Sequence, residues 1–211
     1  MAASTPPVRT PRRSLARVFP AAPMAALVAM LVFTGVLYVV EFVDQLTSLR
    51  LDYEGGILPR EVSGLDGVLF APLLHAGWGH LIANTLPFLI FGFLVMAGGI
   101  GQFIAVTALI WLFSGFGVWL LGPPHTYVVG MSGVIFGWLV FLLVRGFFAR
   151  SATQILLAVV LFALWGGLLF GVLPGQPGIS WQAHLFGALA GVLAAWIVAR
   201  ADRRAATGAV V

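Results

Sequence analysis

The sequence predicts an all-α polytopic membrane protein, a bundle of six transmembrane helices. Of its 211 residues, 61% are hydrophobic and only 9% are charged, and the mean hydropathy is +1.05. A helix needs about 20 apolar residues to cross a hydrocarbon core of roughly 30 Å. Six apolar runs meet this length, and we place the spans at residues 24–42, 79–98, 101–121, 131–149, 153–173 and 182–200.

The two ends of the chain differ in composition from the spans. Residues 1–23 are rich in Pro, Ser, Thr and Arg, so we expect a disordered N-terminal tail. Residues 24–200 then form the membrane domain, and residues 201–211 form a short C-terminal tail. The first apolar run is too long for a signal peptide and lacks a small-residue cleavage site, so we expect it to remain as the first span.

The positions of the arginines predict the orientation of the chain. All eleven basic residues are arginine. Nine fall on one side of a six-span chain, at Arg9, Arg12, Arg13, Arg17, Arg145, Arg150, Arg200, Arg203 and Arg204. The positive-inside rule assigns that side to the cytoplasm, so we expect both termini in the cytoplasm. The net charge of +4 then reflects topology and contact with membrane lipids, and argues against a nucleic-acid partner.

The connection between the first two spans is long and unusually apolar in its second half. It covers residues 44–78, and residues 67–75 contain few polar side chains. A solvated linker would not have this composition. We expect this half to be mostly helical and to pack on the bundle at the outer membrane interface.

Four side chains with catalytic potential share one predicted membrane depth. Spans two, four and six all run from outside to inside, so His80, Asn84, Ser132 and His184 each lie near the outer start of a span. His80 and Asn84 are four residues apart and therefore share a helix face. If these faces turn inward, the four residues converge on one polar site.

Ser132 and His184 are the residue types of nucleophile and base. A serine hydroxyl attacks well only when a neighbouring base takes its proton, and a neutral imidazole does so near pH 7. The resulting oxyanion needs fixed donors. The backbone N–H groups around Met131 and Ser132, and the side chains of His80 and Asn84, are the candidates. No carboxylate occurs in spans two to six, so a Ser/His dyad is favoured over a triad.

With these residues the chain resembles the rhomboid family of intramembrane serine proteases, in its bacterial six-span form. Three motifs carry the resemblance: Gly130-Met131-Ser132-Gly133; His75, His80 and Asn84; and Ala183, His184, Gly187 and Gly191. The resemblance implies that Ser132 is the nucleophile, His184 the base, and His80 and Asn84 the oxyanion donors. It also implies an aromatic contact between Phe136 and the histidine. Many rhomboids carry Trp-Arg in the first loop, where this chain has Asp66-Gly67.

The predicted function is cleavage of transmembrane segments of other membrane proteins through an acyl-enzyme on Ser132. By resemblance, a small residue precedes the cut, and the 174–181 loop and span five control access. No metal or other cofactor is required, and zero cysteines exclude thiolate catalysis. The sequence leaves the oligomeric state open.

Other interpretations compete with this one. A catalytically inactive rhomboid-like protein could bind membrane clients without cutting them. A transporter could use His80 and His184 as proton relays, although acidic residues are nearly absent from the spans. A metal site at His75, His80 and His184 is disfavoured, since residues five apart point to different faces of a continuous helix. We expect His75 to stabilise the first loop by hydrogen bonding, and Gly187 and Gly191 to let span six approach span four.

Overall fold

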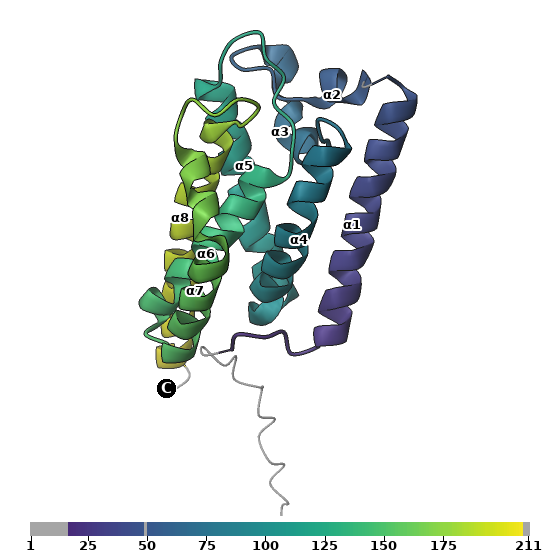
Figure 1. The fold of residues 1–211 in the computed structure, drawn as a ribbon. Helices are drawn as coiled ribbons and strands as arrows, with labels where there is room; N and C mark the ends of the chain where they lie inside the picture. The colour runs from purple at the N-terminus through teal and green to yellow at the C-terminus, as the bar shows by residue number, and fades with distance from the viewer. Residues whose placement is uncertain (1–16, 49, 209–211) are drawn as a thin grey trace, which may run out of the picture.

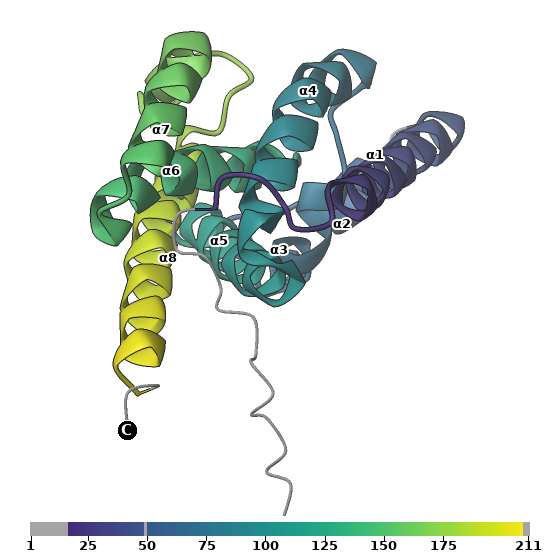
Figure 2. The same cartoon turned by 90° about the horizontal axis from the view of Figure 1, so that it is seen from below.

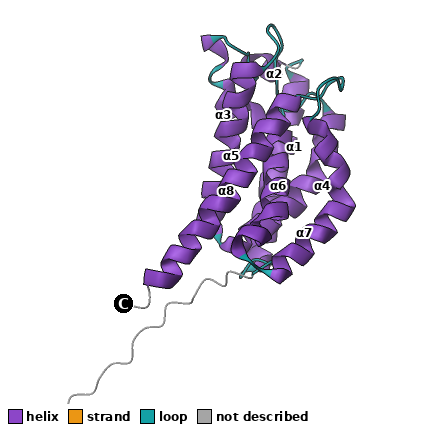
Figure 3. Ribbon diagram, turned by 90° about the vertical axis from the view of Figure 1, so that its left-hand side faces the viewer, coloured by secondary structure: helices purple, strands orange, loops and turns teal. Residues whose placement is uncertain are grey.

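The computed structural model describes residues 17–48 and 50–208 (Figure 1). Within this part of the chain, helices and their connecting loops account for the whole fold, apart from one isolated antiparallel bridge between Ile57 and Val128 (Figure 3). Six helical segments are long and apolar enough to span a membrane: Pro23–Leu46, Trp78–Gly98, Ile100–Leu121, Ser132–Ala149, Ala152–Val172 and Trp181–Ala205. The predicted fold class, a multi-pass helical membrane protein, is confirmed.

The spans are formed by α1 (Pro23–Leu46), α4 (Trp78–Val95) with the 3₁₀ turn η3 (Met96–Gly98), α5 (Ile100–Leu121), α6 (Ser132–Ala149), α7 (Ala152–Trp165) with η4 (Gly166–Val172), and α8 (Trp181–Gly208). The first loop contributes α2 (Arg50–Gly55), η1 (Val62–Gly64), α3 (Gly67–Phe70) and η2 (Ala71–Leu73).

Two predicted boundaries need correction. Helix α1 continues to Leu46, so Asp44, which we assigned to the first loop, is helical and only 1% exposed. Helix α8 continues to Gly208, so the predicted C-terminal tail begins as helix. The reason is composition, because Ala and Arg are strong helix formers outside the membrane as well. Residues 1–16 and 209–211 of the predicted tails lie outside the described part of the chain.

Helix α6 forms the centre of the bundle and packs against α4, α5, α7 and α8. Its tightest neighbour is α8. A Cβ atom on Gly187 would collide with the carbonyl of Gly133, and one on Gly191 would collide with the carbonyl of Gly137. The glycine faces of the two helices therefore bring their backbones together, as the spacing of Gly187 and Gly191 predicts.

The first loop is attached to α5 by side-chain hydrogen bonds. The Trp111 indole donates to the carbonyl of Val68 (3.0 Å), and the Trp119 indole donates to the carbonyl of Glu61 (2.8 Å). Asp66, at the position of the missing Trp-Arg motif, accepts a hydrogen bond from the backbone N–H of Gly67 (2.9 Å) and caps α3. These contacts hold the apolar half of the loop in short helices against the bundle, as its composition predicts.

The opposite end of the bundle is crossed by the segment that precedes α1. Seen from below, this segment runs beneath the helices towards α1 (Figure 2). The backbone carbonyl of Arg17 accepts hydrogen bonds from Arg145 on α6 (3.4 Å) and Gln154 on α7 (3.5 Å). The start of α1 is thereby tied to the centre of the bundle.

Candidate active site

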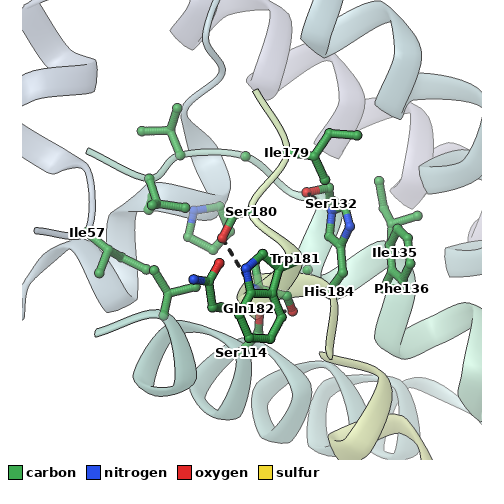
Figure 4. A pocket seen from close by; sticks show the side chains of 18 of the residues that line it. Ile57, Ser114, Ser132, Ile135, Phe136, Ile179, Ser180, Trp181, Gln182 and His184 are labelled. Atoms are coloured by element: carbon green, nitrogen blue, oxygen red, sulfur yellow. Dashed lines mark hydrogen bonds between the residues drawn. The ribbon is translucent and has the colours of Figure 1, made fainter. Parts of the chain in front are cut away.

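Helices α4, α6 and α8 begin at the same end of the bundle and bring Ser132 and His184 into contact. Ser132 is the first residue of α6 and His184 lies in the first turn of α8. The Oγ atom of Ser132 is 2.9 Å from Nε2 of His184. Figure 4 shows the hydroxyl next to the imidazole ring. The glycine contacts one turn deeper make this short distance possible.

The second nitrogen of His184 determines which tautomer the ring adopts. Nδ1 lies 3.0 Å from the carbonyl oxygen of Gly171. A carbonyl only accepts hydrogen bonds, so Nδ1 carries the proton in the neutral ring and donates it to Gly171. Nε2 is then left with its lone pair directed at the Ser132 hydroxyl. This is the arrangement in which the imidazole can take the serine proton.

The ring of His184 is also fixed from the side. Phe136 on α6 stacks on it with 3.8 Å between the ring centroids and 8° between the planes. Gly171 in η4 packs against both rings, and a Cβ atom there would lie 2.8 Å from Nδ1 of His184 and from Cζ of Phe136. Only a residue without a side chain lets this backbone approach the imidazole closely enough to accept its hydrogen bond.

Asn84 and His80 line the same cavity as Ser132 and His184. Its volume is about 760 Å³. The Asn84 side chain is 9% exposed, and its Nδ2 atom has no hydrogen-bond partner among the described residues. A buried amide without a partner is costly, and Asn84 lines the cavity that contains the serine. Within the described part of the chain, no Asp, Glu, Lys or Arg lines the cavity.

The backbone before Ser132 is shaped by Gly130. Its φ of +123° is unfavourable for residues with a side chain, and the His80 ring occupies the space where a Cβ atom would lie. The Gly130 N–H donates to the carbonyl of Ala71 (2.9 Å), which ties this turn to the first loop.

Met131 connects this turn to α6. Met131 is fully buried and is the N-cap residue of the helix. The first N–H groups of a helix have no acceptor in the preceding turn, and the helix dipole favours negative charge at this end. The N–H groups of Met131 and Ser132 are therefore in a position where an anion would be stabilised.

Two expectations about His75 are wrong. We expected it to form hydrogen bonds, but neither ring nitrogen has a partner among the described residues. Burial, and to a lesser degree the nearby His80, lowers the pKa of His75 to about 3, so the ring is neutral. We also expected His75 and His80 to point apart. Helix α4 begins only at Trp78, so His75 precedes the helix and its ring packs edge-on against His80, with 5.2 Å between centroids.

The metal site that the sequence disfavours would also use His184, whose Nε2 lies 2.9 Å from the Ser132 hydroxyl. Among the described residues, no group of three or more His, Cys, Asp or Glu side chains is placed so that it could hold a metal ion.

Ser114 on α5 also belongs to the site, although no sequence motif predicted it. The residue is 5% exposed, and its hydroxyl donates to the carbonyl of Ala183 at 2.8 Å. The Ser114 hydroxyl oxygen also lies against Gly133, where a Cβ atom would collide with it. Ser114 thus contacts the residue after the serine and the residue before the histidine. A hydroxyl inside an apolar span is a signal that could have identified it.

Comparison with known proteins agrees with these motifs. The model of the rhomboid domain matches residues 63–201. This chain belongs to the rhomboid family. An uncharacterized protein of Mycobacterium tuberculosis is 48% identical over 184 residues, which cover 83% of this chain and 76% of that protein.

Two further relatives extend this comparison. An uncharacterized protein of Mycobacterium leprae is 47% identical over 185 residues, covering 84% of this chain and 73% of that protein. The chloroplastic rhomboid-like protein 11 of Arabidopsis thaliana is 30% identical over 151 residues, covering 62% of this chain and 51% of that protein.

Proposed function

We propose that this rhomboid is an intramembrane serine endopeptidase that cleaves transmembrane segments of other membrane proteins. The observation that carries the proposal is the orientation of His184, with Nδ1 donating to Gly171 and Nε2 located 2.9 Å from the Ser132 hydroxyl. A serine that only filled space in a helix interface would not require an imidazole held in this tautomer by a backbone carbonyl.

The first half of the reaction transfers the substrate's acyl group to Ser132. As Oγ bonds to the scissile carbonyl carbon, its proton moves to Nε2 of His184. The carbonyl oxygen becomes an oxyanion, for which Asn84 Nδ2, His80 and the N–H groups of Met131 and Ser132 are the candidate donors. The imidazolium then gives its proton to the amide nitrogen, the C–N bond breaks, and the new amino terminus leaves.

Water completes the cycle. It attacks the acyl-enzyme while His184 takes one of its protons, and the tetrahedral intermediate collapses when that proton returns to Oγ of Ser132. The reaction regenerates the neutral dyad. Each step uses side chains of this chain and water, so the proposal invokes no cofactor.

The cavity favours neutral substrate segments, because no charged side chain from the described residues is present to pair with a charged one. A transmembrane helix must unwind locally before its scissile carbonyl can reach Ser132, since that carbonyl is otherwise hydrogen-bonded. By family resemblance a small residue precedes the cut. The 174–181 loop, in which Gly175 and Gly178 have positive φ and line the cavity, and the lipid-exposed α7 are candidates for the movable parts.

We further propose that the protein lies in the plasma membrane of a bacterium with both termini in the cytoplasm. Arg145, Arg150, Arg200 and Arg203 lie near the end of the bundle opposite to Ser132, and the positive-inside rule assigns that end to the cytoplasm. The dyad then lies near the extracytoplasmic face, its partners are membrane-protein substrates and lipids, and no nucleic acid is involved.

The test is cleavage of a single-span model substrate in proteoliposomes. Wild-type protein should cut the substrate, and Ser132→Ala should reduce the rate by about 10⁴-fold or more while substrate still co-purifies with the variant. Binding without cleavage by correctly folded wild-type protein would instead identify an inactive client-binding protein.

A further inference from the structure

A groove lies at the end of the bundle farthest from the dyad, between the end of α6 and the stretch of α8 from Trp196 to Arg203. Its volume is about 590 Å³, and it is lined by Phe147, Phe148, Ala149, Arg150, Trp196, Ala199 and Arg203. Ala199, 4% exposed, forms the floor. Phe147 and Trp196 form the walls and are 64% and 41% exposed. An apolar groove with a cationic rim therefore opens on the outer surface of the bundle.

The apolar walls continue the surface that faces the membrane interior. On α8, Leu189, Val192 and Trp196 are 50%, 38% and 41% exposed, and their spacing of three and four residues places them on one helix face. Arg203 follows seven residues after Trp196, two turns farther on the same face. At the end of α6, Phe147 is 64% exposed, and Arg150 is the C-cap residue that follows the helix. The apolar face of α8 thus ends in an arginine at the groove, and α6 adds one exposed aromatic residue and a second arginine.

The aromatic and charged groups of the groove are held in place. Arg203 donates to the backbone carbonyl of Phe148 at 2.9 Å, which links α8 to α6. The guanidinium of Arg200 lies 5.2 Å from the centroid of the Trp196 ring. No acidic side chain of the described residues lines the groove.

We propose that this groove binds an anionic phospholipid, with the phosphate between Arg150 and Arg203 and one acyl chain along Phe147 and Trp196. A guanidinium pairs well with phosphate oxygens, and the indole of tryptophan favours the headgroup level of a membrane. A soluble phosphate compound would contact only the arginines, whereas a phospholipid would contact both the arginines and the apolar face of α8 that reaches the groove. The combination of both features selects a lipid.

Lipid retention measured by native mass spectrometry tests this proposal without depending on the proposed protease activity. Delipidated protein is titrated with phosphatidylglycerol or phosphatidylcholine. Phosphatidylglycerol should bind more tightly, and Arg150→Gln should weaken its binding by about fivefold. Arg204→Gln is the matched control, since it removes one charge from the same end of α8 outside the groove and should change binding by less than about twofold.

Two results would overturn the proposal. An equal loss of phosphatidylglycerol affinity in Arg150→Gln and Arg204→Gln would mean that the lipid responds to general surface charge. Equal binding of the two lipids, or displacement of phosphatidylglycerol by inorganic phosphate, would exclude a site for an anionic lipid.

A second measurement locates the acyl chain. Phosphatidylglycerol with brominated acyl chains should quench tryptophan fluorescence in the wild type more than in Trp196→Phe, and the difference should shrink in Arg150→Gln. Both variants must first show the wild-type thermal unfolding temperature. Quenching that is identical with and without Trp196 would place the lipid elsewhere.

Discussion

Helices α6 and α7 follow one another in the chain, yet they are buried to very different extents. Of the most apolar 18 residues in each span, 61% are buried in α6 and 17% in the α7–η4 span. On α7, Leu156, Phe162 and Leu164 are 65%, 59% and 66% exposed. The less buried span is the more apolar one, with a mean hydropathy of 2.6 against 1.9 for α6, so hydrophobicity alone does not decide which is buried. Close backbone packing at glycines decides which span is buried, because lipid provides no hydrophobic force between helices.

This difference separates the fixed part of the site from the part that can move. The α6–α8 pair holds Ser132, Phe136 and His184 and packs through glycines. The α7–η4 span contributes one carbonyl, that of Gly171, to the imidazole. The difference suggests a rigid platform that carries the chemistry beside a loosely packed helix that can yield to a substrate.

The largest effect is expected where the α6–α8 packing is broken. Gly187→Val places a branched side chain against the carbonyl of Gly133 and should destabilise the protein by about 1–3 kcal/mol or more. Both the thermal unfolding temperature and proteolytic activity should fall. Gly101→Ala is the matched control, since nothing lies within 4 Å of a Cβ atom there. A Gly187→Val variant as stable and active as the control would contradict the idea of a packed platform.

The next largest effect is expected at Asn84, which belongs to the site but not to the α6–α8 pair. Asn84→Ala removes the unpartnered Nδ2 donor and should lower kcat by about 10²–10³-fold with little change in KM. Steady-state kinetics on a transmembrane peptide provide both constants. Thr85→Val, which removes a hydroxyl that instead contacts Leu81 and Tyr38, should leave kcat unchanged. An equal loss of kcat in Asn84→Ala and Thr85→Val would indicate a general disturbance of α4.

A smaller effect is expected at Ser114, which supports the platform from α5. Ser114→Ala removes the hydrogen bond to the carbonyl of Ala183 and should reduce kcat about fivefold by loosening the placement of His184. Thr107→Val removes a different hydroxyl of α5, one that contacts Trp138. If Thr107→Val lowered kcat by the same amount, Ser114 would have no special role.

The smallest effect on activity is expected at Asp52, which lies in α2 of the first loop and not in the α6–α8 pair. Burial, followed by the charges of Asp44 and Glu41, raises the pKa of Asp52 from 3.8 to about 7. Between pH 3.8 and about pH 7 the folded state binds more protons than the unfolded state. The free energy of unfolding therefore falls as the pH rises through this range. The unfolding temperature of Asp52→Asn should equal that of the wild type near pH 4 and exceed it near pH 8. The proteolytic rate per folded molecule should be unchanged. A pH dependence retained in the variant would assign the titration to another group.

The sequence predicted the six spans well because length and apolar composition define a membrane helix almost completely. It also predicted that Ser132, His184, His80 and Asn84 would lie at the same end of the bundle, because consecutive spans alternate in direction and every second span therefore starts at the same end. The ends of α1 and α8 were less predictable, because Asp44 and Asp202 resemble loop residues and are nevertheless helical.

The features that the sequence did not provide are those that depend on backbone atoms. The carbonyl of Gly171 orients His184, yet no side chain marks it. His75 was misjudged for a related reason, since the helical spacing rule fails where the helix begins only at Trp78. Local geometry at helix ends decides such contacts, and composition does not reveal it.

The measurement that tests the central claim most directly is labelling of the detergent-purified protein with a fluorescent fluorophosphonate, with the adduct located by mass spectrometry. The α6–α8 platform predicts one adduct, on Ser132, that is absent from Ser132→Ala and lost in His184→Ala. No adduct on wild-type protein that is demonstrably folded, or an adduct that persists without His184, would contradict an activated serine in this rhomboid.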